Sequence, residues 1–348
     1  MTSSVSTAPS DAGQSLYGSD LLAELLRGLG YKYAFINPGS SFRGLHDSIV
    51  NHLGNERPEF VLTTHEMIAV GMAHGYAKAS GEPSLVILHN LVGLMNGSMA
   101  VFNAFCDQVP MLILGGSGPA DPAERRFIDW AHTANTQGDL VRSYVKWTDE
   151  PATLDAAVNS ILAAQRKALT GPTGPAYVSI DAGLQEAPIA AMELPDLSHP
   201  SYGGAPAPHP DPSAVEAVAE ALIGARMPLI FGGRFGLRAE VTPALVDLVE
   251  LVGAAYQDDR NIVCLPTGHP QNLNGDGKLR GEADVLVCFD CQDVTVLTTG
   301  YNAKRSTILT AGQAEKDAFI VDVSLNQYFG NSWTRFGGPV PRADLTLA

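Results

Sequence analysis

Short apolar runs alternate with longer amphipathic stretches along most of the chain. Runs of this kind are typical of strands buried on both faces, and apolar residues spaced three and four apart are typical of helices. In the first half the pattern predicts strands at YAFINPGS, residues 60–63, SLVILHN, PMLILGG and AYVSI. It predicts helices at SDLLAELLRGLG, residues 45–53, the stretch that follows Glu66, GSMAVFNAF, DLVRSYV and residues 154–169.

The alternation breaks at residues 191–210, which are dense in Pro, Gly and Ser, and then begins again. Beyond the break it predicts helices at SAVEAVAEALIGA and TPALVDLVELVG, and strands at PLIFGG, NIVCLP, DVLVCFD, STILT and AFIVDV. We therefore expect an α/β protein with two tandem doubly wound parallel-sheet domains, residues 16–190 and 211–348, joined by a Pro/Gly-rich linker. The polar residues 1–15 are expected to form a disordered arm.

Charge and composition exclude several classes of function. A formal net charge of −15 argues against nucleic-acid partners and against anionic membrane surfaces. No apolar run approaches the roughly 20 residues that span a bilayer, and the N-terminus lacks an apolar signal core, so we expect a cytoplasmic protein. Cys288 and Cys291 form a single CxxC; a zinc site normally needs four ligands, which favours a structural role for both.

Polar residues stand where the predicted strands end. The first domain has Asn37 to Ser40, His65-Glu66, His89-Asn90 and Gly115-Gly116 at such points, and the second has Gly232-Gly233 and the loop PTGHP with His269. Ligands of open α/β sheets bind outside the carboxyl ends of the strands. One acid, several histidines and a serine are the groups of an acid/base site. Because no metal spacing, GxSxG, GxGxxG after a strand or P-loop occurs, we expect a bound cofactor to carry the chemistry.

The motifs NPGS, THEMIAVGMAHGYAKASG and LHNLVGLMNGSMAVFNAFCDQVPMLILGG resemble the pyrimidine-binding domain of thiamine-diphosphate enzymes. Within that family the chain resembles benzoylformate decarboxylase and the acetolactate synthases, and FIDWAHTANTQGDLVRSYVKWTDEP, GPAYVSID and PTGHP fit as well. The resemblance implies that the chain holds the N-terminal and central domains, with thiamine diphosphate as cofactor. It also allows FAD in the central domain, as in some relatives, although no sequence feature requires it.

The resemblance assigns roles to individual residues. Glu66 would hydrogen-bond N1′ of the cofactor's aminopyrimidine, in apolar surroundings that suit a carboxylate with raised proton affinity. Ser40 would hold the substrate carboxylate, and His89 and His269 would exchange protons at the substrate carbonyl. The other residues expected at the cofactor are Pro38, Gly39, Gly93 and Asn96. Phe42, Leu91, Leu94 and Met95 either shape the substrate pocket or belong to the core.

Alternatives from the residues alone remain open at these positions. Glu66 also suits the positive end of a helix dipole, and Ser40 also suits a turn that caps the next helix. His89 also suits a hydrogen-bonded histidine at a strand end, and His269, before a proline, suits a turn. His65 is expected to pack beside Glu66 or to support it.

The family binds the diphosphate and Mg²⁺ through a GDG motif on a third domain. The GDG at Gly275 to Gly277, with Asn302 downstream, follows no buried strand and is rejected as that motif. The sequence therefore predicts no metal ligands in this chain. We expect a companion subunit with the diphosphate domain, in a hetero-oligomer built on homodimer contacts, or else a fragment of a longer enzyme.

Three functions fit this organisation. The first is one subunit of a split lyase that decarboxylates a 2-oxo acid or cleaves a 2-hydroxyacyl compound through an enamine intermediate. The second is a carboligase of the acetolactate-synthase type, which shares that intermediate and differs in what captures it. The third is a non-catalytic regulatory subunit. Glu66 argues against the third, and His89 favours the first over the second because most acetolactate synthases have no histidine there.

Overall fold

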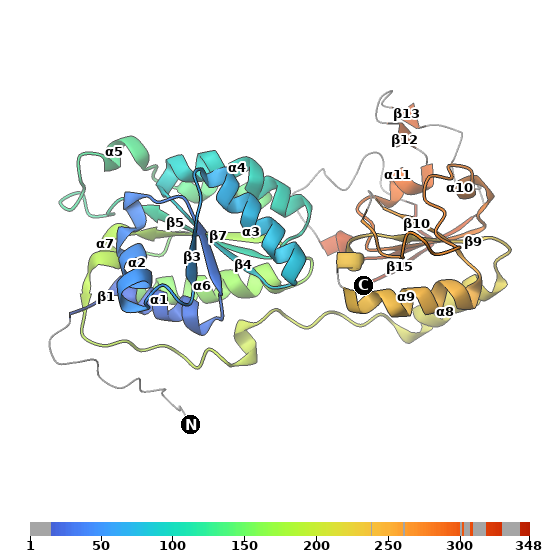
Figure 1. Ribbon diagram of the computed structural model, residues 1–348, viewed down its shortest axis with the longest axis horizontal. Coiled ribbons are helices and arrows are strands. Elements are labelled where there is room, and N and C mark those ends of the chain that lie inside the picture. The colour runs from blue at the N-terminus through green and yellow to red at the C-terminus, as the bar shows by residue number, and fades with distance from the viewer. Residues whose placement is uncertain are drawn as a thin grey trace. The chain divides into compact units, whose positions relative to one another are not determined.

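The computed structural model describes residues 15–237, 239–259, 262–299, 301–302, 307–308, 318–328 and 342–348. The chain divides into two compact units, Met1–Pro206 and Ala207–Ala348 (Figure 1). Each unit is built on its own parallel sheet. All but the last residue of the arm expected at 1–15 lies outside the described residues.

The first unit contains a six-stranded sheet in which every neighbouring pair of strands is parallel. The strand order is β3-β2-β4-β5-β7-β6. Parallel pairing places the carboxyl ends of all six strands at one edge of the sheet, where the chain passes into the following helices. The strands are β2 (Tyr33–Ile36), β3 (Glu59–Leu62), β4 (Ser84–Leu88), β5 (Met111–Ser117), β6 (Thr148–Asp149) and β7 (Pro175–Asp181).

Helices cover both faces of this sheet (Figure 1). The helices α1 (Gly18–Gly28), α2 (Arg43–Asp47) and α6 (Leu154–Leu169) pack on one face, and α3 (Glu66–Ser80) and α4 (Asn90–Cys106) pack on the other. Within β4 the residues alternate between the two cores, Leu85 and Ile87 facing one and Val86 and Leu88 the other. No helix in the described ranges is long and apolar enough to cross a membrane.

Shorter elements complete the first unit. Strands β1 (Leu16–Tyr17) and β8 (Pro188–Ile189) form an antiparallel pair that joins the two ends of the unit. The remaining helical segments are η1 (Ser40–Phe42), η2 (Ser48–His52), α5 (Asp129–His132), η3 (Gln137–Leu140), η4 (Arg142–Tyr144), α7 (Ala182–Glu186) and η5 (Pro200–Tyr202).

Much of the Pro/Gly-rich stretch at 191–210 packs on the first unit. Met192, Leu194, Leu197 and Tyr202 contact the core formed by α1, α2 and α6. The division between the two units, after Pro206, lies inside this stretch. Its apolar residues therefore hold its first part against the first unit.

The second unit contains a five-stranded parallel sheet in the order β10-β9-β11-β14-β15. One face packs on α8 and α9, which lie side by side (Figure 1), and the other packs on α10 and α11. Two parallel sheets covered by helices confirm the predicted α/β class. The elements are α8 (Pro212–Gly224), β9 (Pro228–Gly232), η6 (Arg234–Leu237), η7 (Ala239–Val241), α9 (Thr242–Val252), β10 (Ala255–Asp258), α10 (Leu279–Glu282), β11 (Val285–Phe289), α11 (Val294–Thr299), β12 (Tyr301–Asn302), β13 (Thr307–Ile308), β14 (Phe319–Val323), η8 (Asn326–Tyr328) and β15 (Leu345–Leu347).

Two predicted elements are wrong. DLVRSYV forms the 3₁₀ turns η3 and η4 instead of one helix, because Val141 and Val145 are already buried by this compact path. In NIVCLP, residues 262–266 form a loop, while the strand is β10, just upstream. Cys264 is buried in that loop and its amide donates to Asp258 Oδ1 at 3.2 Å. An apolar run therefore marked burial at this point but not strand geometry.

The sheet of the first unit offers a matched stability test. Leu85 in central β4 is fully buried, whereas Leu62 in edge strand β3 is 66% exposed. We expect Leu85→Ala to lower the free energy of unfolding by about 2–5 kcal/mol, because it removes core contacts and leaves a cavity. Leu62→Ala should change it by less than about 0.5 kcal/mol. Urea unfolding followed by tryptophan fluorescence, to which Trp147 on the same core as Leu85 contributes, measures both; equal losses would contradict the assignment.

Candidate active site at the strand carboxyl ends

Glu66 is a buried carboxylate at the first turn of α3. His65 precedes it in extended conformation and caps the helix, since its Nδ1 accepts from Met67 N at 3.1 Å. Two amides hold the carboxylate: Asn37 Nδ2 donates to Oε1 at 3.0 Å, and Asn96 Nδ2 donates to Oε2 at 3.2 Å. A carboxylate has about four acceptor positions, so both oxygens retain capacity for a further hydrogen bond.

Gly93 on α4 brings Glu66 and His89 close together. A Cβ at this glycine would lie 3.1 Å from His89 Cβ and 3.3 Å from Glu66 Oε1. Any larger residue would press on both groups, so glycine allows the first turn of α4 to lie close to the first turn of α3. The structure thus places three of the predicted residues, Glu66, His89 and Gly93, in one cluster, with Asn96 bound to Glu66.

The serine that contacts His89 is Ser41. Its hydroxyl lies 2.8 Å from His89 Nδ1 and accepts from Asn90 N at 2.9 Å. Ser41 is buried against β5, where only a glycine at position 116 leaves room for it. If the Ser41 hydroxyl donates to Nδ1, the proton of the neutral imidazole stands on Nε2. Ser40, the predicted carboxylate-binding serine, is exposed, and its hydroxyl bonds to no described residue.

The surroundings of His89 disfavour its charged form. Burial is the main reason that the pKa of His89 lies below its usual 6.5, and the neighbouring His132 lowers this pKa further. Glu66 acts in the opposite direction, followed by smaller opposing effects of Arg126 and Asp129. His89 is therefore neutral at pH 7 and can act as a proton acceptor.

Other predicted residues fall into two groups. Gly39 lies directly against the His89 ring, while Pro38 before it is exposed. Phe42 and Leu94 are buried in the two cores and so serve the fold. Asn37, Ser41 and His132 complete the cluster; sequence reasoning named Asn37 only as a strand-end residue and did not single out Ser41 or His132. Asn37 opens the NPGS motif and Ser41 directly follows it, so the position of this motif at a strand end was the available signal for Ser41.

His269 lies in the second unit and is engaged by that unit's own residues. Its Nε2 is 3.2 Å from Glu250 Oε1 on α9, and its Nδ1 accepts from Gln271 N at 3.2 Å. These contacts stabilise the loop after β10. A proton-transfer role for His269 stays a prediction.

The GDG sequence of the second unit forms a local turn. The Asp276 carboxylate accepts from Lys278 N at 2.9 Å, and the Asp276 carbonyl accepts from Gln257 Nε2 at 2.7 Å. The segment follows a single bridge residue, Asn272, and not a strand. In the described part of the chain, no group of three or more His, Cys, Asp or Glu residues is placed to hold a metal ion.

The CxxC cysteines belong to the core of the second unit. Cys288 on β11 and Cys291 just after it are both fully buried and are not joined in a disulfide. Burial raises the pKa of the Cys291 thiol, which disfavours the thiolate that redox or metal chemistry requires.

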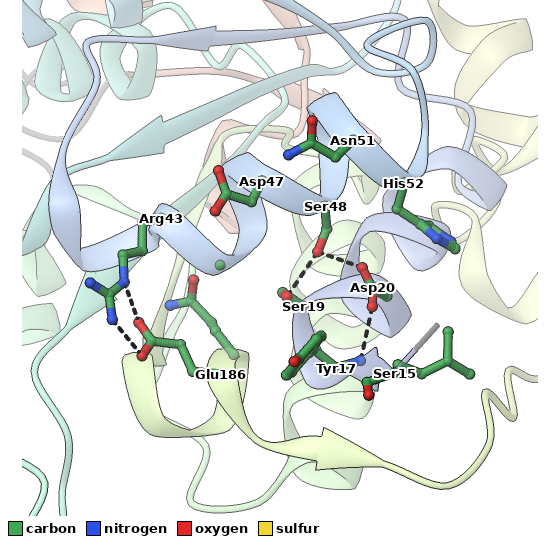
Figure 2. Close-up of a pocket in the computed structure, with 13 residues that line it drawn as sticks. Ser15, Tyr17, Ser19, Asp20, Arg43, Asp47, Ser48, Asn51, His52 and Glu186 are labelled. Carbon is green, nitrogen blue, oxygen red and sulfur yellow. Dashed lines mark hydrogen bonds and ion pairs between the residues drawn. The ribbon is translucent and has the colours of Figure 1, made fainter. Parts of the chain in front are cut away.

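Two cavities of the first unit differ in character. One, of about 490 Å³, lies at the carboxyl ends of β5 and β7. Its lining includes Arg126, Asp129, Thr133, Ser179 and Asp181. The other, of about 610 Å³, lies between α1, α2 and α7 and is shown in Figure 2.

Several polar groups of the second cavity are paired with one another. Ser48 bonds to Ser19 and Asp20 at 2.8 and 2.7 Å, and Arg43 makes two 2.8 Å contacts with Glu186 (Figure 2). This network holds α1 and α2 in place.

The geometry at the strand ends can be compared with known proteins. Residues 16–138 match the family model described as "Thiamine pyrophosphate enzyme, N-terminal TPP binding domain"; thiamine pyrophosphate is another name for thiamine diphosphate. The first unit therefore contains the N-terminal domain of the thiamine pyrophosphate enzyme family. The matched region contains the whole Glu66–His89 cluster.

Individual relatives in this family include decarboxylases and synthases. Over 236 residues the chain is 33% identical to benzoylformate decarboxylase of Pseudomonas aeruginosa, a match that covers 65% of this chain and 41% of that protein. Over 313 residues it is 24% identical to the catabolic acetolactate synthase of Raoultella terrigena, covering 86% of this chain and 53% of that protein. The chain thus spans about half the length of the curated relatives that it matches.

Solved structures of the family share the fold. The thiamine diphosphate-dependent 4-hydroxybenzoylformate decarboxylase of Rhodococcus jostii RHA1 superposes with a TM-score of 0.75 at 21% identity. The match covers 94% of this chain and 59% of that one. Both units of the present chain therefore have counterparts in an enzyme of this family.

The residues at Glu66 fit the pyrimidine end of thiamine diphosphate. Glu66 is buried, accepts from two amide donors and keeps acceptor capacity, and the absence of a side chain at Gly93 leaves its Oε1 uncrowded on that side. An aminopyrimidine presents a ring nitrogen that can share a proton with such a carboxylate. Glu66, Gly93 and Asn96 are thus the residues that would hold this end of the cofactor.

The lowered pKa of His89 predicts how the free energy of unfolding depends on pH. As pH falls through 6.5, the unfolded chain takes up a proton on this histidine before the folded chain does, so the free energy of unfolding falls with it. One proton contributes at most about 1.4 kcal/mol per pH unit. Urea unfolding of wild type and His89→Gln between pH 7.5 and 5 should show a shallower decline in the variant. Parallel declines would contradict the burial effect at His89.

Proposed function

We propose that the first unit is the pyrimidine-binding half of a thiamine-diphosphate-dependent lyase that acts on a 2-oxo acid or a 2-hydroxyacyl compound. The observation that carries this proposal is the buried Glu66 carboxylate, held by two amides beside a neutral histidine. Burying a carboxylate is costly unless hydrogen bonds offset it, and the fold has no structural need for an acid there. The names of relatives, which include a benzoylformate decarboxylase, support the substrate class.

Each residue of the cluster has a distinct task in this proposal. Glu66 exchanges a proton with the pyrimidine ring nitrogen through one of its carboxylate oxygens. The cofactor, when bound, supplies the carbon nucleophile and the electron sink for cleavage of the substrate C–C bond. His89, oriented by Ser41, accepts and returns a proton at the substrate carbonyl through Nε2. Asn37 and Asn96 keep Glu66 in place while its charge changes.

A carboligase of the acetolactate-synthase type is the second candidate, favoured by the synthases among the relatives. It would use Glu66 in the same way and would differ in the acceptor that captures the activated aldehyde. His89 favours the lyase, since a group that returns a proton to the reacting carbon promotes release over ligation. A non-catalytic regulatory role has no observation in its favour, because Glu66 and both its donors are in place.

The outer surface of α3 and α4 supports a protein partner next to this site. Met67, Ile68 and Met72 on α3 and Met95 and Met99 on α4 are between 43% and 59% exposed. The two helices pack side by side, and Met67 and Met95 directly adjoin Glu66 and Asn96. Exposed large apolar side chains gathered on two neighbouring helices favour an interaction site, and methionine adapts well to a partner.

We propose that a companion subunit with a diphosphate- and Mg²⁺-binding domain covers this methionine face. Such a partner would complete the cofactor site, because the diphosphate carries most of the cofactor's charge and needs a metal loop that the described residues do not supply. An acidic chain would repel that end of the cofactor. The assembly would be a hetero-oligomer built on homodimer contacts.

Removing the proton-exchanging acid tests the function. Glu66→Gln keeps the shape and the amide contacts but cannot take up and return a proton, so turnover of 2-oxo acids by the assembled enzyme should fall on the order of 10²-fold or more. Glu56→Gln, at an exposed acid of the same unit, is the matched control and should retain activity. Decarboxylation of a panel of 2-oxo acids is the assay; normal turnover by Glu66→Gln would remove the role assigned to Glu66.

Cofactor binding by the chain itself tests the proposed partner. One charge-assisted hydrogen bond contributes roughly 1.5–3 kcal/mol. With some apolar contact added, we expect thiamine diphosphate to bind the 348-residue chain with a Kd of about 1 mM. Isothermal titration calorimetry with Mg²⁺ present measures this value. Micromolar binding would show that the chain itself holds the diphosphate and that the proposed partner is not needed for it.

A further inference from the structure

A second imidazole stands beside His89. His132, the last residue of α5, meets the His89 ring edge to face, with the ring centroids 5.3 Å apart and the planes at 88°. Unlike His65, His74 and His269, His132 makes no ring hydrogen bond to another described residue. His132 is half-buried, so its ring nitrogens are neither fully covered by the protein nor fully exposed to solvent.

The residues on either side of His132 are anchored. Asp129 is buried and accepts from Arg126 N at 2.8 Å, with Arg126 Nη2 at 3.5 Å from its other oxygen. Thr133 Oγ1 accepts from Asn90 Nδ2 at 3.1 Å and from Gly118 N at 3.3 Å. Asn90 follows His89 directly, so the same stretch that carries one imidazole fixes the position of the other.

This corner of an acidic protein gathers groups that carry or can carry positive charge. Arg126, His89 and His132 lie around it, and the facing acids are Glu66 and Asp129. Both acids are already engaged, Glu66 by two amides and Asp129 by Arg126. Because the chain as a whole has a net charge of −15, such a corner is where an anionic ligand is best tolerated.

We propose that His132 binds the carboxylate of the anionic substrate while His89 faces its keto group. The proposal rests on the function proposed above and extends it to substrate recognition. In a 2-oxo acid the carboxylate and the keto group are on adjacent carbons, so two imidazoles in ring contact can each address one of them. Ser41 is committed to His89 and Asn90, and Ser40 is exposed, so neither serine is as well placed for the carboxylate.

Binding to the chain itself is the first test. Chain labelled with ¹³C at histidine Cε1 is titrated by NMR with benzoylformate and, separately, with benzaldehyde, which lacks the carboxylate. We expect saturable shifts of His132 and His89 with benzoylformate only. His132→Gln should abolish the saturable shift of His89, and His46→Gln, at a histidine stacked on Phe60 elsewhere in the unit, should preserve it. No saturable shift in the wild type, or an unchanged His89 shift in His132→Gln, would overturn the proposal.

Kinetics of the assembled enzyme separate this inference from the function on which it rests. His132→Gln should raise KM for benzoylformate about 10-fold or more, because the imidazole that would bond to the substrate carboxylate is lost, with a smaller change in kcat. If wild type turns over 2-oxo acids and the variant has the same KM, recognition by His132 is wrong and the proposed function stands. If wild type turns over none while the NMR binding depends on His132, the proposed function fails and the recognition site stands.

Discussion

Burying the Glu66 carboxylate is the constraint around which this edge of the first unit is organised. A buried ionised acid is tolerated only where hydrogen bonds and dipoles replace its water. Asn37 from the end of β2 and Asn96 from α4 supply two amides, and the first turn of α3 supplies the positive end of a helix dipole. The end of β2, the start of α3 and α4 must therefore all be in place before the ionised form of this acid can be buried.

The same constraint sets how closely α4 can begin. Gly93 lies against both Glu66 and His89. Because glycine has no side chain, the acid and the imidazole can both pack closely against the start of α4. Ser41 and Gly116 repeat this arrangement on the other side of His89, where a small residue on β5 admits a buried hydroxyl. Small residues at the strand ends are as much a part of the site as the groups that carry protons.

The sequence predicted the architecture well, because buried parallel strands produce apolar runs that few other structures share. It also predicted Glu66, His89, Gly93 and Asn96, which the structure brings into one cluster. It failed where local pattern and tertiary contact disagree: Cys264 is buried in a loop held by Asp258, and the turns at 137–144 read as a helix. Ser41 and His132 were missed because their contacts are long-range, and the loop around His132 has no periodicity from which to place it.

The alternation of β4 between two cores has an evolutionary consequence. Leu85 and Ile87 face one core, Val86 and Leu88 the other, and His89 continues this alternation at the strand end. Inserting or deleting one residue within β4 would exchange the faces of the side chains that follow in this strand and turn the imidazole away from Ser41. Descendants of this sequence can therefore gain or lose residues within this strand only in pairs, whereas surface loops in general tolerate insertions and deletions.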